Sequence, residues 1–111
     1  MESITALNID NFSRALNSGT GQIVIYFSAS WCQPCHSMKP VFAELARQTV
    51  NPEITFGAVD MAESPTIAQT HGIRSVPSIA VFRHGKLMDV VAGETPLDEL
   101  RGRVQSALSI S

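Results

Sequence analysis

Residues 23–29, with the sequence IVIYFSA, form a short and nearly continuous apolar run that contains β-branched and aromatic side chains. A strand that met water on one face would alternate apolar and polar residues, so this run is typical of a strand covered on both faces. Helices must then pack on both sides of the sheet that holds the strand. The run therefore predicts an α/β fold with a central sheet between two layers of helices.

The remaining hydrophobic patterns predict a mixed sheet of four to five strands, because helices alternate with strands until a closing hairpin. Asn8 or Asp10 is expected to cap the first helix and Ser64 the third, and Gly72 to end the third. Pro40 predicts a kink in the second helix. The expected elements are an edge strand near 3–7, a helix around 12–16, strands 23–29 and 54–60 with a helix from the cysteines onward between them, a helix 65–71, strands 78–82 and 87–92 joined by a turn at 84–86, and a helix from 96 to about 109.

Length and composition indicate one soluble globular domain spanning residues 1–111. The net charge of −2 and the absence of a Lys/Arg cluster argue against nucleic acid or an anionic membrane as a partner. The chain has no apolar stretch of the ~18 residues that a membrane span needs. The opening MESITALNIDNF lacks the basic and apolar regions of a secretory signal, so we expect a cytoplasmic protein, acting as a monomer.

The two cysteines lie two residues apart in the segment FSASWCQPCHSMKP, residues 27–40. In a reducing compartment such a pair is more often catalytic or metal-binding than a permanent cross-link. Three chemistries use this spacing. CQPCH formally matches the attachment motif for a c-type haem. The pair could also bind zinc together with His36, His71 or His84, although a second ligand pair at useful spacing is absent. The third chemistry is thiol–disulfide exchange.

The position of the pair favours exchange, because Cys32 and Cys35 fall where the first long strand passes into a helix. Pro34 is well tolerated in a first helical turn. Cys32 would lie at the helix terminus, where unpaired N–H groups and the helix dipole favour its thiolate. Cys35 would lie one turn inward. We therefore expect Cys32 to attack a target disulfide as the nucleophile, and Cys35 to resolve the mixed disulfide that results.

Over nearly its whole length the sequence resembles the thioredoxin family. The Trp31–Cys35 box is similar to the WCxPC motif of that family, and more distant positions also match. These matching positions are Phe27, Ala29, Pro40, Asp60, the GIRSVPS segment of residues 72–78, Phe82, Gly85 and Gly93.

The resemblance implies a thioredoxin fold and roles that spacing alone does not give. Pro77 would follow a cis peptide bond, which is found at only about 5–6% of X–Pro bonds. The backbone of Val76 would pair with an extended client segment. Electrons would come from a thioredoxin reductase, and neither a metal nor an organic cofactor is expected. The residues expected to bind client proteins are Trp31, Gln33, Pro34, Val76, Pro77 and Gly93.

Several positions depart from the family pattern and leave the redox potential and the exchange rate open. Tyr26 stands where many thioredoxins carry a buried Asp, and a phenol is a poor base at neutral pH. Gly57 or Ala58 replaces a Lys that partners this Asp. Tyr26 and His36 are therefore candidates for tuning the site. The further departures are Ser28 in place of a second Trp, Gln33 in place of Gly, and His36 in place of a basic residue.

The lost Asp and Lys also support an alternative function from a different class. The same apolar surface could make the chain a client-binding module or holdase, whose redox activity is weak or regulatory. Turnover of a protein disulfide separates the two hypotheses.

Overall fold

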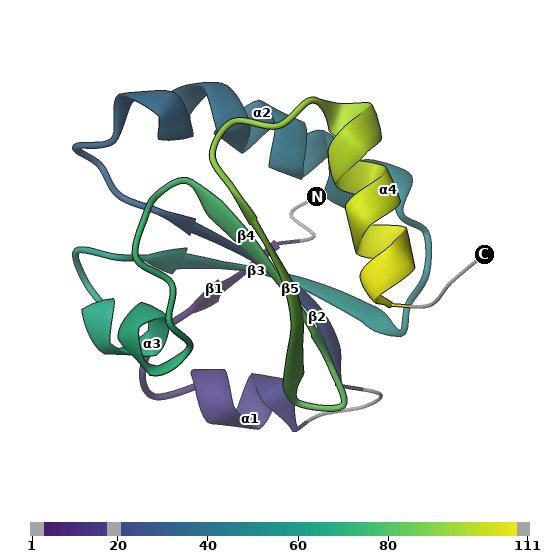
Figure 1. Cartoon of the computed structure of the whole chain (residues 1–111). Coiled ribbons are helices and arrows are strands. Elements are labelled where there is room, and N and C mark those ends of the chain that lie inside the picture. Colours follow the sequence, from purple (N-terminus) through teal and green to yellow (C-terminus); the bar gives the residue numbers. More distant parts are fainter. Residues whose placement is uncertain (1–3, 18–20, 109–111) are drawn as a thin grey trace.

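A computed structural model describes residues 4–17 and 21–108, and it shows a five-stranded mixed sheet with the strand order β1-β3-β2-β4-β5 (Figure 1). β1, β3 and β2 run parallel, whereas β4 pairs antiparallel with both β2 and β5. The mixed sheet and the edge strand are confirmed, although residue 3 lies outside the described residues. The strands are β1 (Ile4–Leu7), β2 (Gln22–Ser28), β3 (Ile54–Asp60), β4 (Ser78–Arg83) and β5 (Lys86–Ala92).

Helices cover both faces of the sheet, as the apolar run in the sequence predicted (Figure 1). α2 and α4 pack on one face, and α1 and α3 pack on the other. α2 continues through Pro40, and the kink predicted there stays a prediction. The helices are α1 (Phe12–Leu16), α2 (Gln33–Gln48), α3 (Pro65–Thr70) and α4 (Leu97–Ala107).

β2 lies at the centre of the sheet and divides the hydrophobic core into two clusters. Val24 and Tyr26 face the cluster under α2 and α4, whereas Ile23, Ile25 and Phe27 face the cluster under α1 and α3. All five side chains are buried, because alternate residues of a strand point to opposite faces and both faces are covered. This strand leads directly to the cysteine pair, so the buried central strand of the sheet supports the candidate site.

Of the two predicted helix N-caps, the one at α1 is wrong and the one at α3 is correct in position. Asn11, not Asn8 or Asp10, occupies the N-cap position of α1, and its side chain makes no cap bond. The Asn8 side chain instead accepts hydrogen bonds from the backbone N–H groups of Asp10 and Asn11, at 2.9 and 3.1 Å, in the preceding turn. Ser64 occupies the N-cap position of α3, as predicted, although its side chain makes no cap bond. The turn before α3 is held by hydrogen bonds to Asp60.

Two other chain reversals agree with the sequence more closely. Gly72 follows the C-terminal end of α3 with a φ of +71°, which confirms it as the residue that ends this helix. The β-hairpin turns at His84 and Gly85, with φ values of +53° and +76°, so Lys86 already belongs to β5. The predicted helix from 96 to about 109 is α4, which runs from Leu97 to Ala107 with Leu108 as its C-cap; residue 109 lies outside the described residues.

His71 gives the fold a predicted pH dependence. Its ring lies 5.4 Å from the Phe12 ring and 5.0 Å from the Phe82 ring, and burial lowers the pKa of His71. The unfolded chain then binds more protons below about pH 6.5, so the contribution of His71 to stability is complete above that pH and is lost as the pH falls through it. Urea unfolding at pH 5 and pH 7.5 is expected to show a smaller loss at acid pH in His71→Gln than in the unchanged protein. Equal losses would contradict this role.

Candidate active site

The two cysteines lie at the N-terminal end of α2 and are joined by a disulfide, with their Cα atoms 5.3 Å apart. Cys32 is the N-cap residue, with an extended backbone, and Cys35 is the third residue of the helix. Pro34 falls in the first turn, as the sequence predicted. The placement at the junction of β2 and α2 is therefore confirmed, and it brings the two sulfur atoms to one helix terminus.

The local hydrogen bonding distinguishes the two sulfur atoms. The backbone N–H of Cys35 donates to Cys32 Sγ at 3.2 Å, so the sulfur takes the place of a capping oxygen. An anion is stabilised at this end of a helix by the unpaired N–H groups and by the helix dipole. Once the disulfide is reduced, this environment favours the thiolate of Cys32. Cys32 and Cys35 are each 4% exposed in the disulfide form, so attack on a client requires docking close to the pair.

The loop before β4 lies against the core that holds the cysteines. The Val76–Pro77 peptide bond is cis, which confirms the expectation from the family resemblance. Val76 packs against the hydrophobic cluster that contains Cys32 and Cys35. The carbonyl of Pro77 accepts a hydrogen bond from the N–H of Gly93 at 2.8 Å, and this bond joins the two segments proposed to contact a client.

The other residues assigned to client binding lie at the surface around the start of α2. Trp31 is 72% exposed, so its side chain belongs to the surface and not to the core. Gln33 and Pro34 are exposed as well. His36 is exposed in the first turn of α2, and no contact shows that it tunes the cysteine pair.

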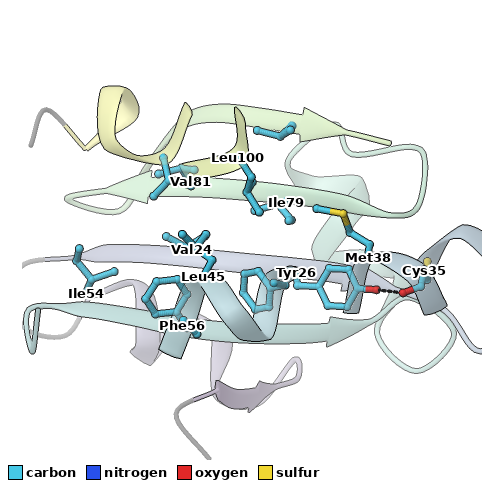
Figure 2. Packing of buried hydrophobic residues seen from close by; sticks show 14 of the residues in the cluster. Val24, Tyr26, Cys35, Met38, Leu45, Ile54, Phe56, Ile79, Val81 and Leu100 are labelled. Carbon is cyan, nitrogen blue, oxygen red and sulfur yellow. Dashed lines mark hydrogen bonds between the residues drawn. The ribbon is translucent and has the colours of Figure 1, made fainter. Parts of the chain in front are cut away.

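Tyr26 reaches the site from within the core, with its hydroxyl directed at Cys35 (Figure 2). Its side chain is only 5% exposed, and its hydroxyl donates a hydrogen bond of 2.7 Å to the backbone carbonyl of Cys35. Burial raises the pKa of Tyr26 above its usual value near 10, and a hydrogen bond with the Ser28 hydroxyl opposes this shift. The phenol is therefore neutral at physiological pH and cannot replace the carboxylate that many relatives carry as a base.

The position beside Tyr26 on β3 is also uncharged. Tyr26 pairs with Ala58 in parallel register, and paired residues of parallel strands face the same side of the sheet. Gly57 faces the opposite side, where a Cβ atom would lie 2.5 Å from Cδ1 of Leu7. The family resemblance left open whether Gly57 or Ala58 stands where many relatives carry a Lys. Ala58 is the one that lies beside Tyr26. Sequence reasoning did not connect Ser28 with Tyr26, although their spacing of two in β2 places both side chains on one face.

The histidines His71 and His84, which could have completed a zinc site with the cysteines, do not lie beside the pair. His71 lies on the far face of the sheet among Phe12 and Phe82, and His84 lies at the hairpin turn. Residues 4–17 and 21–108 contain no group of three or more His, Cys, Asp or Glu residues placed to hold a metal ion. Within the same residues, no helix is both long and apolar enough to cross a membrane.

A buried disulfide at the N-terminus of a helix, beside a cis-proline loop on a mixed sheet, defines a class of thiol–disulfide oxidoreductases. Comparison with known proteins identifies the family. The thioredoxin family model matches residues 3–106, and the chain belongs to the thioredoxin family. Cys32 and Cys35 occupy its CxxC position, so the protein acts by dithiol–disulfide exchange.

Individual relatives agree with this assignment. The chain is 41% identical to a thioredoxin H-type of Ricinus communis over 85 residues, which cover 77% of this chain and 70% of the relative. It is 29% identical to thioredoxin 1 of Synechococcus elongatus over 108 residues, covering 97% and 100% of the two chains. The solved structure of Malassezia sympodialis thioredoxin superposes with a TM-score of 0.84 at 30% identity, covering 96% of this chain and 92% of that one.

Proposed function

We propose that the protein works as a reductant of disulfides in client proteins, with Cys32 as the nucleophile and Cys35 as the resolving thiol. The observation that carries the proposal is the hydrogen bond from the Cys35 N–H to Cys32 Sγ at the start of α2. The Cys32 thiolate attacks a client disulfide and forms a mixed disulfide, releasing one client sulfur. Cys35 then attacks Cys32 Sγ and frees the second client sulfur, which leaves the client reduced and the pair oxidised.

The client is proposed to bind across the cysteine pair as an extended segment. Trp31 supplies exposed apolar surface, and the backbone of Val76 would pair with the segment as an added strand. Gly93 is linked to Pro77 and has a φ of +84°, with open space where a Cβ atom would lie. Gln33 and Pro34 complete the surface on the helix side of Cys32.

A thioredoxin reductase is proposed as the electron donor, which gives the protein a part in electron transport and in cell redox homeostasis. We place this cycle in the cytoplasm, where a reducing environment would restore the dithiol. The relatives include chloroplastic thioredoxins of Zea mays and Chlamydomonas reinhardtii, so localisation of the native protein in cells is the direct test. No nucleic acid, membrane or second copy takes part in the proposed cycle.

The test is steady-state reduction of a model protein disulfide such as insulin, with NADPH and a thioredoxin reductase as the electron source. We expect turnover, and we expect Trp31→Ala to raise KM about three- to tenfold with little change in kcat, because an exposed aromatic anchor contributes to binding. Val50→Ala is the matched control, since Val50 is an apolar residue that is 92% exposed just beyond the other end of α2.

The holdase alternative makes the opposite prediction for the same assay. The holdase would be favoured if the protein bound clients without measurable turnover and if Trp31→Ala abolished that binding. This result would overturn the proposed reductase function.

A further inference from the structure

The carbonyl of the resolving cysteine is held by a side chain from another element. Tyr26 lies in β2, and its hydroxyl donates to the Cys35 carbonyl across the interface between the sheet and α2 at 2.7 Å (Figure 2). The bond is buried, so water does not compete for the carbonyl. It fixes the first turn of α2 relative to the central strand.

The phenol ring is itself held in place, which makes the bond rigid. The Tyr26 ring stacks on Phe42, with the ring centroids 5.3 Å apart and the planes at 27°, and Phe42 lies two turns further along α2. Tyr26 therefore contacts α2 at two points, the Cys35 carbonyl and the Phe42 ring.

The ordinary helical hydrogen bonding of α2 is interrupted close to the turn that carries Cys35. Pro40 has no N–H group, so the carbonyl of His36 lacks its usual helical donor. The carbonyl that Tyr26 binds belongs to the residue immediately before His36. The hydrogen bond from β2 thus reinforces the helix at the turn that carries Cys35.

We propose that Tyr26 is a positioning residue for the resolving step: its hydroxyl fixes the Cys35 backbone so that Cys35 Sγ stays within reach of Cys32 Sγ in the mixed disulfide. The inference rests on the proposed roles of the two cysteines. The advantage is one of effective concentration, since intramolecular attack is fast only when the two sulfur atoms are held in a reactive geometry.

The bonds and protons of the resolving step balance without any proton from Tyr26. In the resolving step the Cys35 thiol loses a proton to solvent, and its thiolate forms a bond to Cys32 Sγ. The bond between Cys32 Sγ and the client sulfur breaks, and the client leaves as a thiolate that takes up a proton. The Tyr26 hydroxyl remains protonated and continues to donate to the Cys35 carbonyl throughout this step. Its neighbour on β3, Ala58, has an uncharged side chain. The titratable side chains of the neighbouring segments include His36 and Lys39 on α2, Asp60 at the end of β3, Arg74 in the loop before Val76 and Glu94 after β5, and all of them are exposed.

Tyr26→Phe tests the proposal, because it removes the hydroxyl and keeps the ring that stacks on Phe42. Rapid mixing of the reduced protein with a client disulfide is expected to show a resolving step slowed about five- to tenfold, with the mixed disulfide accumulating. The equilibrium constant for closing the Cys32–Cys35 disulfide against glutathione should fall by a similar factor, and tenfold corresponds to about 30 mV. The pH profile for alkylation of Cys32 by iodoacetamide is expected to be unchanged, since the Cys35 N–H still donates to Cys32 Sγ.

Thr49→Val is the matched control, because Thr49 also donates a side-chain hydroxyl to an α2 carbonyl, that of Leu45, at 2.7 Å but at the opposite end of the helix. It should reduce stability to a similar degree and leave the resolving step unchanged. Equal resolving rates in Tyr26→Phe and the unchanged protein, or an equal slowing in Thr49→Val, would overturn the positioning role. If the unchanged protein forms no mixed disulfide at all, the proposed function fails instead.

Discussion

Replacing Cys32 by Ser is expected to abolish the reduction of client disulfides, lowering turnover by roughly three orders of magnitude or more. A hydroxyl at the N-cap of α2 can still accept the Cys35 N–H, so the helix keeps its cap. What is lost is the sulfur nucleophile. The Cys35 thiol is not expected to substitute for it, because the N-cap position and the hydrogen bond from the Cys35 N–H favour a thiolate at Cys32 and not at Cys35. The measurement is the reduction of insulin by the protein with NADPH and a reductase.

Cys35→Ser is expected to give the opposite behaviour, which makes the two variants controls for each other. Both lack the disulfide, so any general effect of losing this cross-link is common to them. With Cys32 intact and no resolving thiol, the first step goes forward and the mixed disulfide persists. Non-reducing electrophoresis should therefore show covalent adducts with clients in Cys35→Ser and none in Cys32→Ser. Adducts in Cys32→Ser would assign the nucleophile to Cys35 and reverse the roles proposed here.

The sequence predicted most of the architecture because burial on two faces leaves a clear pattern. The apolar run at residues 23–29 became β2 at the centre of the sheet, and the cysteine pair fell at its junction with α2. The cis bond at Pro77 came from the family resemblance and not from periodicity. Ser64 lies at the N-cap of α3 as its residue type predicted, but the sequence could not show that its side chain makes no cap bond and that Asp60 holds the turn before it.

The part of the site that sequence could not supply depends on which residues meet across elements. The family resemblance implied that Tyr26 stands where many thioredoxins carry an acidic residue, but only the packing of α2 on β2 places its hydroxyl against the Cys35 carbonyl. Likewise, the choice between Gly57 and Ala58 depends on the register of β3 beside β2. A shift of one residue in that register would exchange the two faces. The contacts of Tyr26 and the position of Ala58 beside it therefore depend on tertiary packing, which the sequence alone does not show.

Tyr26 and Ala58 leave the core beside the disulfide without a group that can exchange a proton near neutral pH. A buried carboxylate with a Lys partner can exchange a proton near neutral pH, whereas a neutral phenol beside Ala58 cannot. The exchange kinetics of this protein should accordingly reflect the ionisation of its two thiols, without a further buried acid. The cysteine pair is then held in place by packing and hydrogen bonding. The contribution of this packing to the free energy of unfolding can be measured.

Phe42→Ala is expected to lower the free energy of unfolding by about 3–5 kcal/mol. The Phe42 side chain is 1% exposed, stacks on Tyr26 and meets the Phe56 ring edge-on at 5.8 Å. Truncation would leave a cavity lined by rings from β2 and β3, whose backbones are fixed at the centre of the sheet and cannot collapse into it. Since small domains have total stabilities of about 5–15 kcal/mol, the loss is a large fraction of the whole.

Urea unfolding of the disulfide form, followed by circular dichroism, measures this loss. Val50→Ala serves as the control at an exposed apolar position and should change the free energy of unfolding by less than about 0.5 kcal/mol. Phe42→Leu retains much of the volume and should cost less than Phe42→Ala. A loss below about 1 kcal/mol in Phe42→Ala would show that α2 can settle onto the sheet without this ring. The stacking on Tyr26 would then not be what holds the phenol against the Cys35 carbonyl.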